Sequence, residues 1–251
     1  MEPTGYFQHL HPRVAMVTCV SPAVREVFTR LPGFRAEKAV VVSKGHDPAW
    51  YEGIEPLDLH SAFGIPAGRL VVGMVANARR MKGIEYLIEA IGRLAPGLGL
   101  HFLFVGQGLA EAVGQAPGQA TSYADALTFA GFRSDVLELL AGVDISLLPS
   151  VKGEGLSKVL LESMFLGRPT IMTAIGGNRE LGIHGQTAWI VPPRDASALA
   201  EALTILAQDP RLRRQLGAAG RAYVRAHFSA RASAEALAAA YTKLLAEDTR
   251  Y

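Results

Sequence analysis

Short apolar runs rich in β-branched residues alternate with longer stretches of helical spacing, and this alternation constrains the fold more than any other feature. The runs expected to form strands are Ala15–Val20, Ala39–Val42, Leu70–Val75, His101–Val105, Ala126–Ala130, Ile145–Leu148, Pro169–Met172 and Ala188–Val191. The stretches expected to form helices are Ala23–Leu31, Ile84–Leu94, Leu109–Gly114, Ser134–Ala141, Lys158–Leu166 and Ala196–Ala207. From Leu70 onward the runs are nearly continuous in apolar residues, as in a parallel sheet covered by helices on both faces. The alternation predicts an α/β fold with a doubly wound parallel sheet, which binds ligands at the carboxyl ends of its strands.

The last part of the chain reads as helical. Asp195 is suited to cap one helix, and Asp209 followed by Pro210 is suited to open the next. The stretch Ala230–Ala246 is rich in alanine and leucine and amphipathic, so we expect it to lie against the sheet or another domain. The segment Gly114–Thr121 is expected to form a mobile surface loop.

Composition narrows the class of protein. With 49% hydrophobic and 19% charged residues, the chain is typical of a globular protein with a sizeable core. A formal net charge of +2 gives no argument for binding nucleic acid or an anionic membrane surface. The single cysteine, Cys19, excludes an internal disulfide and lies in an apolar run, which predicts a buried thiol in a reducing compartment. The reducing compartment that the single cysteine indicates is the cytoplasm, where the chain could also lie at the membrane periphery. No apolar run reaches the ~18 residues of a spanning helix.

Two carboxylates, Glu154 and Glu162, flank a predicted junction between a loop and a helix. Ser157 is a suitable N-cap for a helix that begins at Lys158, and Gly155 lets the backbone approach a ligand. The free amides at such a helix start suit an anion such as a diphosphate. Carboxylates at two depths could accept hydrogen bonds from two sets of hydroxyls, on a sugar and on a ribose. By spacing alone, a solvated loop carboxylate and an ordinary helix-face charge explain the pair more simply.

Two further turns follow predicted strands and could contact the same ligand. Arg79, Arg80 and Lys82 lie where parallel sheets usually bind phosphates, although a solvated basic turn explains them equally well. A Gly-Gly turn that includes Gly177 could bring backbone amides to a ligand, or could simply connect a strand to a helix. The three places gain weight together because they occur in chain order at strand ends of one predicted sheet.

Six segments in register resemble the family 4 group of retaining glycosyltransferases, often called the glycosyl transferases group 1 domain. Their order and spacing match over roughly Val17 to Pro192. The segments are Val75–Gly83, Phe104–Gly108, Phe129–Val136, Asp144–Ser150, Glu154–Glu162 and Gly167–Glu180. The resemblance implies a two-domain GT-B fold, with this chain supplying the Rossmann-like, nucleotide-sugar-binding C-terminal domain.

The resemblance also implies catalytic roles for two residues. Glu154 would hold hydroxyls of the donor sugar, and Lys82 would neutralise the donor diphosphate. Asn77 stands where the family usually has an arginine, so Arg79 or Arg80 would substitute for it. Such cations and a helix start would stabilise the leaving diphosphate electrostatically, so we expect no metal and no cofactor beyond the nucleotide-sugar substrate.

The remaining donor-binding residues that the resemblance implies lie in three loops. Phe132 and Arg133 would frame the base, and Glu162 would bind the ribose. The others, for contacts to sugar and phosphate, are Gly155, Leu156, Ser157, Lys158 and Gly177.

The expected organisation is a remnant of an N-terminal domain with a linker in residues 1–45, a nucleotide-sugar-binding domain in 46–229, and an amphipathic helix in 230–251. Residues 1–45 are too few for the N-terminal domain that binds the acceptor in GT-B enzymes. We therefore expect a truncated transferase half that needs that domain from elsewhere, with an N-terminal-domain partner chain or a homo-oligomer as possible assemblies.

Other interpretations stay open. The chain could be one subunit of a split transferase, or a donor-site remnant that binds nucleotide or a partner without turnover. It could also be a different doubly wound protein, such as a relative of nucleotide-sugar epimerases. The nucleotide base, the sugar and the acceptor, whether polysaccharide, lipid-linked glycan or small molecule, are not indicated by the sequence.

Overall fold

The structure, a computed structural model, describes residues 8–116 and 121–248, and the chain divides into two compact units. The large unit is Tyr51–Arg225, and the small unit combines Met1–Trp50 with Ala226–Tyr251.

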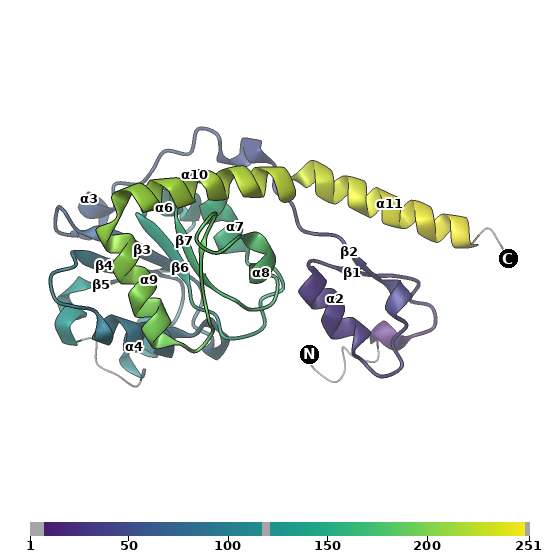
Figure 1. The fold of residues 1–251 in the computed structure, drawn as a ribbon, viewed down its shortest axis with the longest axis horizontal. Coiled ribbons are helices and arrows are strands. Elements are labelled where there is room, and N and C mark those ends of the chain that lie inside the picture. The colour runs from purple at the N-terminus through teal and green to yellow at the C-terminus, as the bar shows by residue number, and fades with distance from the viewer. Residues whose placement is uncertain (1–7, 117–120, 249–251) are drawn as a thin grey trace. The chain divides into compact units, whose positions relative to one another are not determined.

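The large unit is built on a six-stranded parallel sheet in the order β5-β4-β3-β6-β7-β8 (Figure 1). In register, β3 pairs with β4 from Leu70↔Leu100 onward and with β6 at Val72↔Ile145. The strand order reverses between β3 and β6, which is where doubly wound sheets bind ligands. The predicted doubly wound α/β fold is confirmed. The strands are β3 (Leu70–Val75), β4 (Leu100–Val105), β5 (Leu127–Gly131), β6 (Ile145–Leu148), β7 (Thr170–Thr173) and β8 (Trp189–Val191).

Helices cover this sheet (Figure 1) and bury its apolar side chains. Ile91 of α4 and Leu203 of α9 are fully buried, and each such side chain stabilises the fold by about 1.5–3 kcal/mol. The predicted caps form, because Asp195 accepts a hydrogen bond from Ala198 N at 2.9 Å and Asp209 accepts one from Leu212 N at 2.8 Å. The helices are α3 (Leu59–Phe63), α4 (Ile84–Arg93), α5 (Leu109–Gly114), α6 (Val136–Gly142), α7 (Lys158–Phe165), α8 (Asn178–Leu181), α9 (Ala196–Gln208) and α10 (Pro210–His227).

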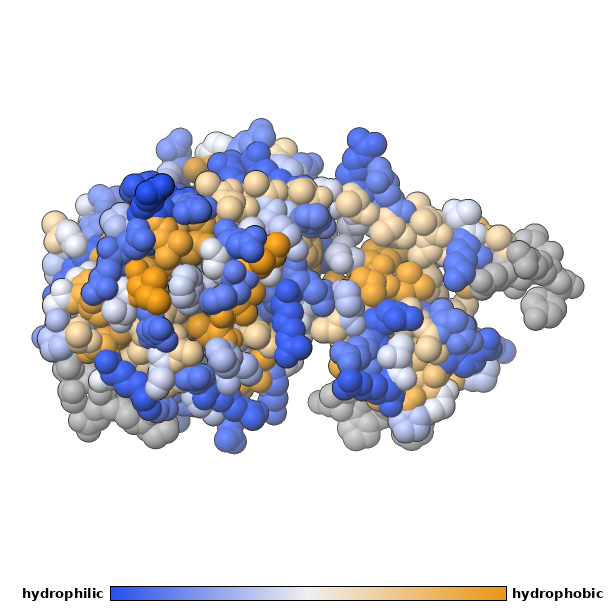
Figure 2. Space-filling model, viewed as in Figure 1, coloured by the Kyte–Doolittle hydropathy of each residue, from blue (hydrophilic) through white to orange (hydrophobic). Residues whose placement is uncertain are grey.

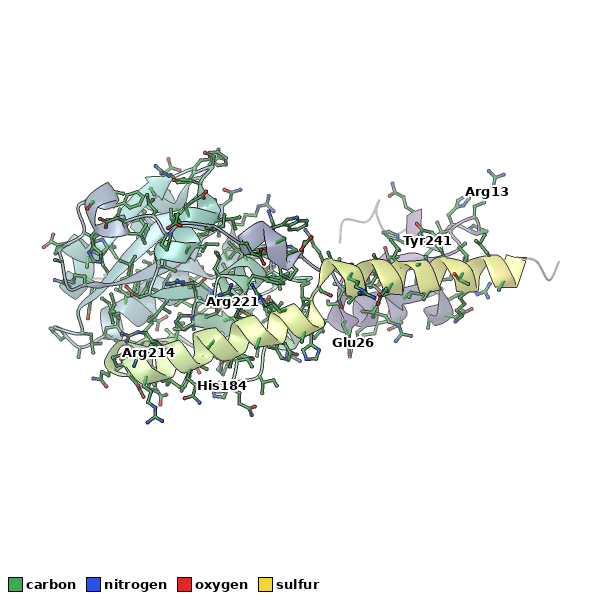
Figure 3. The ribbon with its side chains drawn as sticks, turned by 90° about the horizontal axis from the view of Figure 1, so that it is seen from above. Arg13, Glu26, His184, Arg214, Arg221 and Tyr241 are labelled. Atoms are coloured by element: carbon green, nitrogen blue, oxygen red, sulfur yellow. The ribbon has the colours of Figure 1, made fainter. Side chains whose placement is uncertain are left out.

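Glycines let α10 lie close to loops of the large unit. An added Cβ on Gly217 would stand 2.2 Å from the carbonyl oxygen of Gly167, and one on Gly220 would stand 2.6 Å from that of Thr187. Figure 3 shows Arg214 and Arg221 on this helix, with His184 in the neighbouring loop. None of the described helices is both long and apolar enough to cross a lipid bilayer.

The small unit has a two-stranded parallel sheet, β1 (Val17–Cys19) with β2 (Ala39–Val41), connected by α2 (Pro22–Thr29). Ser21 caps α2 by accepting a hydrogen bond from Val24 N at 3.2 Å. The core consists of four buried side chains, Val17, Cys19, Phe28 and Ala39.

The thiol of Cys19 is fully buried, as predicted. Burial raises the pKa of the Cys19 thiol, and the nearby charge of Arg25 opposes this in part.

The helix α11 (Ala230–Asp248) also belongs to the small unit. Among residues 230–246, Ala240 is its one buried side chain, whereas Tyr241 is 53% and Leu245 67% exposed. Only a small part of the surface of this helix is therefore buried by packing. Figure 2 shows apolar side chains, in orange, reaching the surface in both units.

The predicted and observed bounds of strands and helices differ by at most two residues. The short helices α3 and α8 were not predicted, because neither offers enough turns for a periodic pattern. Residues 117–120 of the expected mobile loop lie outside the described residues.

Candidate functional site

The loops that leave β3 and β6 meet beside the point where the strand order reverses. After β3 the chain forms a 3₁₀ turn, Arg80–Lys82, and Met81 accepts a hydrogen bond from Val151 N at 2.8 Å. Gly83 closes this turn with a φ of +68°, and an added Cβ would stand 2.1 Å from the carbonyl oxygen of Pro149. A side chain at position 83 would push the two loops apart, so glycine is required there.

A third loop, which leaves β7, holds the loop from β6 in place. Gly177 N donates to the carbonyl oxygen of Glu154 at 3.0 Å, and the hydroxyl of Thr173 donates to the carbonyl oxygen of Ser150. Gly176 has a φ of +44°, and an added Cβ would stand 1.9 Å from the carbonyl oxygen of Glu154. We call residues 76–83, 149–157 and 173–178 the three-loop cluster.

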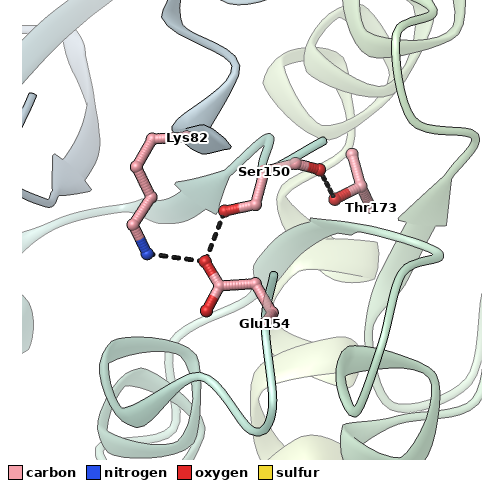
Figure 4. Close-up of polar contacts among 4 residues, drawn as sticks. All are labelled: Lys82, Ser150, Glu154 and Thr173. Atoms are coloured by element: carbon pink, nitrogen blue, oxygen red, sulfur yellow. Dashed lines mark hydrogen bonds and ion pairs between the residues drawn. The ribbon is translucent and has the colours of Figure 1, made fainter. Parts of the chain in front are cut away.

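The carboxylate of Glu154 lies at the centre of the three-loop cluster (Figure 4). Its Oε1 is 2.6 Å from the ammonium of Lys82 and accepts a hydrogen bond from Ser150 Oγ, also at 2.6 Å. The Glu154 side chain is 9% exposed and that of Lys82 19%. Removal of either charge would strand its partner in a poorly solvated place, so the pair stabilises the site as a unit. Among the described residues, no donor bonds the second oxygen, Oε2.

The second predicted carboxylate, Glu162, lies on α7 and is 8% exposed. Lys158 Nζ is 3.2 Å from its Oε1. Beside it, the ring of Tyr51 stacks on Phe165, with centroids 4.8 Å apart. Burial above all, and then the negative charge of Glu162, raises the pKa of the Tyr51 phenol, which therefore stays protonated at neutral pH.

Ser157 takes the N-cap position of α7, as predicted, with an extended backbone at φ −73° and ψ 115°. Its hydroxyl makes no capping hydrogen bond, so the side chain of Ser157 does not bond the first backbone amides of α7. Gly155 and Leu156, just before it, are partly exposed. A helix start of this kind presents N–H groups to an anion.

The basic turn after β3 differs in exposure along its length. Arg79 and Arg80 are exposed, and neither side chain makes a hydrogen bond or ion pair with another described residue. Asn77 accepts a hydrogen bond from Gln107 N at 3.2 Å, so it anchors the turn to the loop after β4. The two arginines are the cations of this turn that remain open to a ligand.

Phe132 and Arg133 lie in the loop after β5, but the surroundings of their side chains differ. Phe132 is 71% exposed, which leaves its ring open for stacking. The guanidinium of Arg133 pairs with both carboxylate oxygens of Asp135, at 2.8 and 2.5 Å, and lies 5.7 Å from the ring of Phe63. Hydrogen bonding to Asp135 raises the pKa of Arg133, so this side chain is already engaged within the protein.

The loop after β7 also contains a polar group without a protein partner. Asn178 is fully buried, and both its Nδ2 and its Oδ1 lack a hydrogen bond among the described residues. Buried amides are nearly always satisfied, so this one is suited to an ordered water or a polar ligand group. The amide of its neighbour Gly177, in contrast, is committed to Glu154.

The pattern of the sequence did not single out Ser150, Thr173 or Tyr51. Ser150 and Thr173 stand at the ends of β6 and β7, and their positions just after two predicted strands are the signal that could have singled them out. In residues 8–116 and 121–248, no three His, Cys, Asp or Glu side chains gather as a metal site would require.

The chain is similar in sequence and in fold to known glycosyltransferases. Residues 58–223, which lie within the large unit, match the family described as glycosyl transferases group 1. The chain is similar to N-acetyl-alpha-D-glucosaminyl L-malate synthase of Bacillus anthracis, with 29% identity over 170 residues, 68% of this chain and 44% of that protein. It is also similar to the putative glycosyltransferase EpsD of Bacillus subtilis, with 28% identity over 223 residues, 87% of this chain and 58% of that protein.

Two solved structures share the fold. The Anabaena protein HepE in complex with UDP-glucose has a TM-score of 0.79 and 22% identity, covering 91% of this chain and 64% of that one. Sucrose-phosphate synthase from Thermosynechococcus elongatus has a TM-score of 0.74 and 28% identity, covering 92% of this chain and 59% of that one. The chain therefore spans about half to two thirds of the length of the proteins it resembles.

Proposed function

The chain belongs to the glycosyl transferases group 1 family, and from that membership we propose that it binds a nucleoside-diphosphate sugar and takes part in transferring the sugar to an acceptor. The observation that carries the proposal is the joining of Lys82, Ser150 and Glu154 beside the point where the strand order reverses, where doubly wound sheets bind ligands. A cation and a carboxylate at that place suit the two ends of such a donor, its diphosphate and its sugar.

The diphosphate is assigned to Lys82, the exposed Arg79 and Arg80, and the start of α7. When the bond from the anomeric carbon to the diphosphate breaks, the leaving group gains negative charge. Fixed cations and helix amides stabilise that charge at the moment it develops. These groups supply the stabilisation without a metal ion, and metal independence is part of the proposal.

The hydroxyls of the donor are assigned to the two carboxylates. Glu154 presents Oε2 to the sugar while Oε1 accepts a hydrogen bond from the protein, and Glu162 accepts from the ribose. Phe132 is assigned to the base, because its exposed ring offers a stacking surface. A retaining stereochemical course is the part of the proposal that rests on the resemblance to family 4.

Acceptor recognition is assigned to a further domain, supplied by the same or a partner chain. This chain spans 44% and 58% of the lengths of the two relatives compared above. Residues 1–45 would form the end of that domain, and 46–229 the donor domain. A second candidate is a module that binds a nucleotide sugar without turnover. Assays for released nucleoside diphosphate with and without an added N-terminal domain distinguish the two.

The test is a binding titration of the whole chain with UDP, GDP and ADP and with UDP-glucose, GDP-mannose and ADP-glucose. At least one nucleotide, together with its sugar nucleotide, is expected to raise the melting temperature of the chain. Glu154→Ala is expected to weaken binding of the sugar nucleotide by about 5- to 150-fold, since hydrogen bonds to sugar hydroxyls are lost. The exposed Glu201→Gln on α9 is the matched control and should bind as the unaltered chain does. Absence of binding for every compound would refute the proposal.

A further inference from the structure

The carboxylate of Glu154 is held asymmetrically. Both protein donors, Lys82 Nζ and Ser150 Oγ, bond the same oxygen, Oε1 (Figure 4). In the described residues, nothing donates to Oε2. Bonding on one oxygen restricts the rotation of the carboxylate and leaves the other oxygen available to accept a hydrogen bond from a ligand hydroxyl.

The two donors differ in how firmly they are placed. Lys82 ends a long flexible side chain that is 19% exposed. Ser150 is fully buried, and its hydroxyl sits one rotatable bond from the backbone. The peptide group that follows Ser150 is held at both of its polar atoms, because the carbonyl of Ser150 accepts from Thr173 and the amide of the next residue, Val151, donates to Met81.

A bound nucleotide-sugar donor changes the partners of Lys82 and Glu154. The diphosphate carries more negative charge than a carboxylate and draws the ammonium of Lys82 toward itself. Glu154 then loses one of its two donors while it remains nearly buried, and Ser150 is the protein donor left on Oε1. Building on the proposed function, we propose that Ser150 is the positioning residue that keeps Glu154 oriented toward the donor sugar while Lys82 serves the diphosphate.

The proposal predicts a selective effect on the sugar. Ser150→Ala removes the fixed donor without touching the groups assigned to the diphosphate or the base. We expect affinity for UDP-glucose to fall about tenfold, and affinity for UDP to change less than about twofold. If another nucleotide pair binds the unaltered chain, that pair replaces UDP and UDP-glucose. A residue with only a structural role would weaken both ligands alike.

Three variants complete the experiment. Ser150→Cys keeps a weak donor of similar shape and should lose less sugar affinity than Ser150→Ala. Ser146→Ala is the matched control, because this buried hydroxyl on β6 bonds Ser163 Oγ at 2.7 Å and not Glu154. Thr173→Val removes the hydrogen bond to the Ser150 carbonyl while keeping the side-chain shape, and it should give a smaller selective loss of UDP-glucose affinity. This variant tests the proposal if Ser150→Ala does not fold.

The outcomes separate this inference from the proposed function. If Glu154→Gln lowers UDP-glucose affinity selectively and Ser150→Ala does not, the role of Ser150 is overturned and the donor site stands. An equal loss of UDP and UDP-glucose affinity in Ser150→Ala, or in Thr173→Val, also overturns it. If the unaltered chain binds neither nucleotides nor their sugars, the proposed function falls and the role of Ser150 falls with it.

Discussion

The large unit and the small unit both use parallel strands joined through helices, yet they differ in how much structure those strands organise. Six strands in the large unit support three loops that lock one carboxylate in place. Two strands of three residues each in the small unit support a core of four buried side chains and a surface hollow of about 600 Å³ beside α2 and β2.

This difference indicates which unit is rigid enough to hold functional groups in place. A parallel sheet is normally covered on both faces, and two strands alone are marginally stable in water. We therefore expect the small unit to open more readily than the large one. Precise placement of functional groups needs a scaffold that does not open, and the large unit provides it.

The largest expected effect breaks the small unit selectively. Phe28→Ala removes a ring that lies 4.9 Å from His9 and 5.5 Å from Phe34, at a cost of about 3 kcal/mol. The only cysteine, Cys19, lies in the same core and reports on opening, so its reaction with a thiol reagent should accelerate about 100-fold. Val27→Ala on the same helix, at a side chain that is 52% exposed, should leave the rate unchanged. If Phe28→Ala also destabilises the large unit equally, as judged by its urea unfolding, the two units are not independent.

An intermediate effect tests the rigidity of the large unit. Gly176→Ala places a Cβ against the carbonyl oxygen of Glu154, whereas Gly185→Ala introduces the same kind of strain at a φ of +70° with no atom within 4 Å. Gly176→Ala should therefore destabilise the large unit by about 2 kcal/mol more than Gly185→Ala does. Urea unfolding followed by circular dichroism measures the difference, and the reaction rate of Cys19 should not change. Equal free energies of unfolding for the two variants would mean that the three-loop cluster accommodates the added Cβ without loss of stability.

The smallest expected effect concerns pH. Hydrogen bonds from Arg133 lower the pKa of Asp135, so this carboxyl group contributes stability above its unfolded pKa of about 4 and loses it as the pH falls through the folded value. Asp135→Asn should destabilise the large unit slightly at pH 7, and this difference should shrink toward pH 3. The effect is small because the two side chains are 36% and 32% exposed. The exposed Asp125→Asn is the control, and a difference that is constant with pH would contradict the assignment.

The fold could be predicted from the sequence wherever a pattern was long and clearly bounded. The strands Leu70–Val75 and Ile145–Leu148 and the helix Leu109–Gly114 form with the predicted bounds, since each is an apolar or periodic run between turn residues. The four-residue helix α8 escaped prediction because such a short helix depends on tertiary contacts and leaves no periodic signal.

The candidate site could be predicted only in part. Lys82 and Glu154 were recognised through the motifs that contain them, but their ion pair joins residues 72 positions apart. The hydrogen bond from Ser150 depends on how the chain turns back after β6, and the position of Thr173 depends on β7 lying next to β6. Local patterns carry no information about which strands become neighbours, so these partners emerge only from the folded sheet.

The reversal of strand order has a consequence for how the protein is made. As the chain leaves the ribosome, β3, β4 and β5 are complete before β6 exists, and they can form one half of the sheet on their own. The three-loop cluster cannot assemble until β6 returns across that half to pair with β3, a contact of high sequence separation that forms slowly. A nascent chain that stops within α6 would thus hold Lys82 without its carboxylate, and competence to bind a ligand should appear late and abruptly in folding.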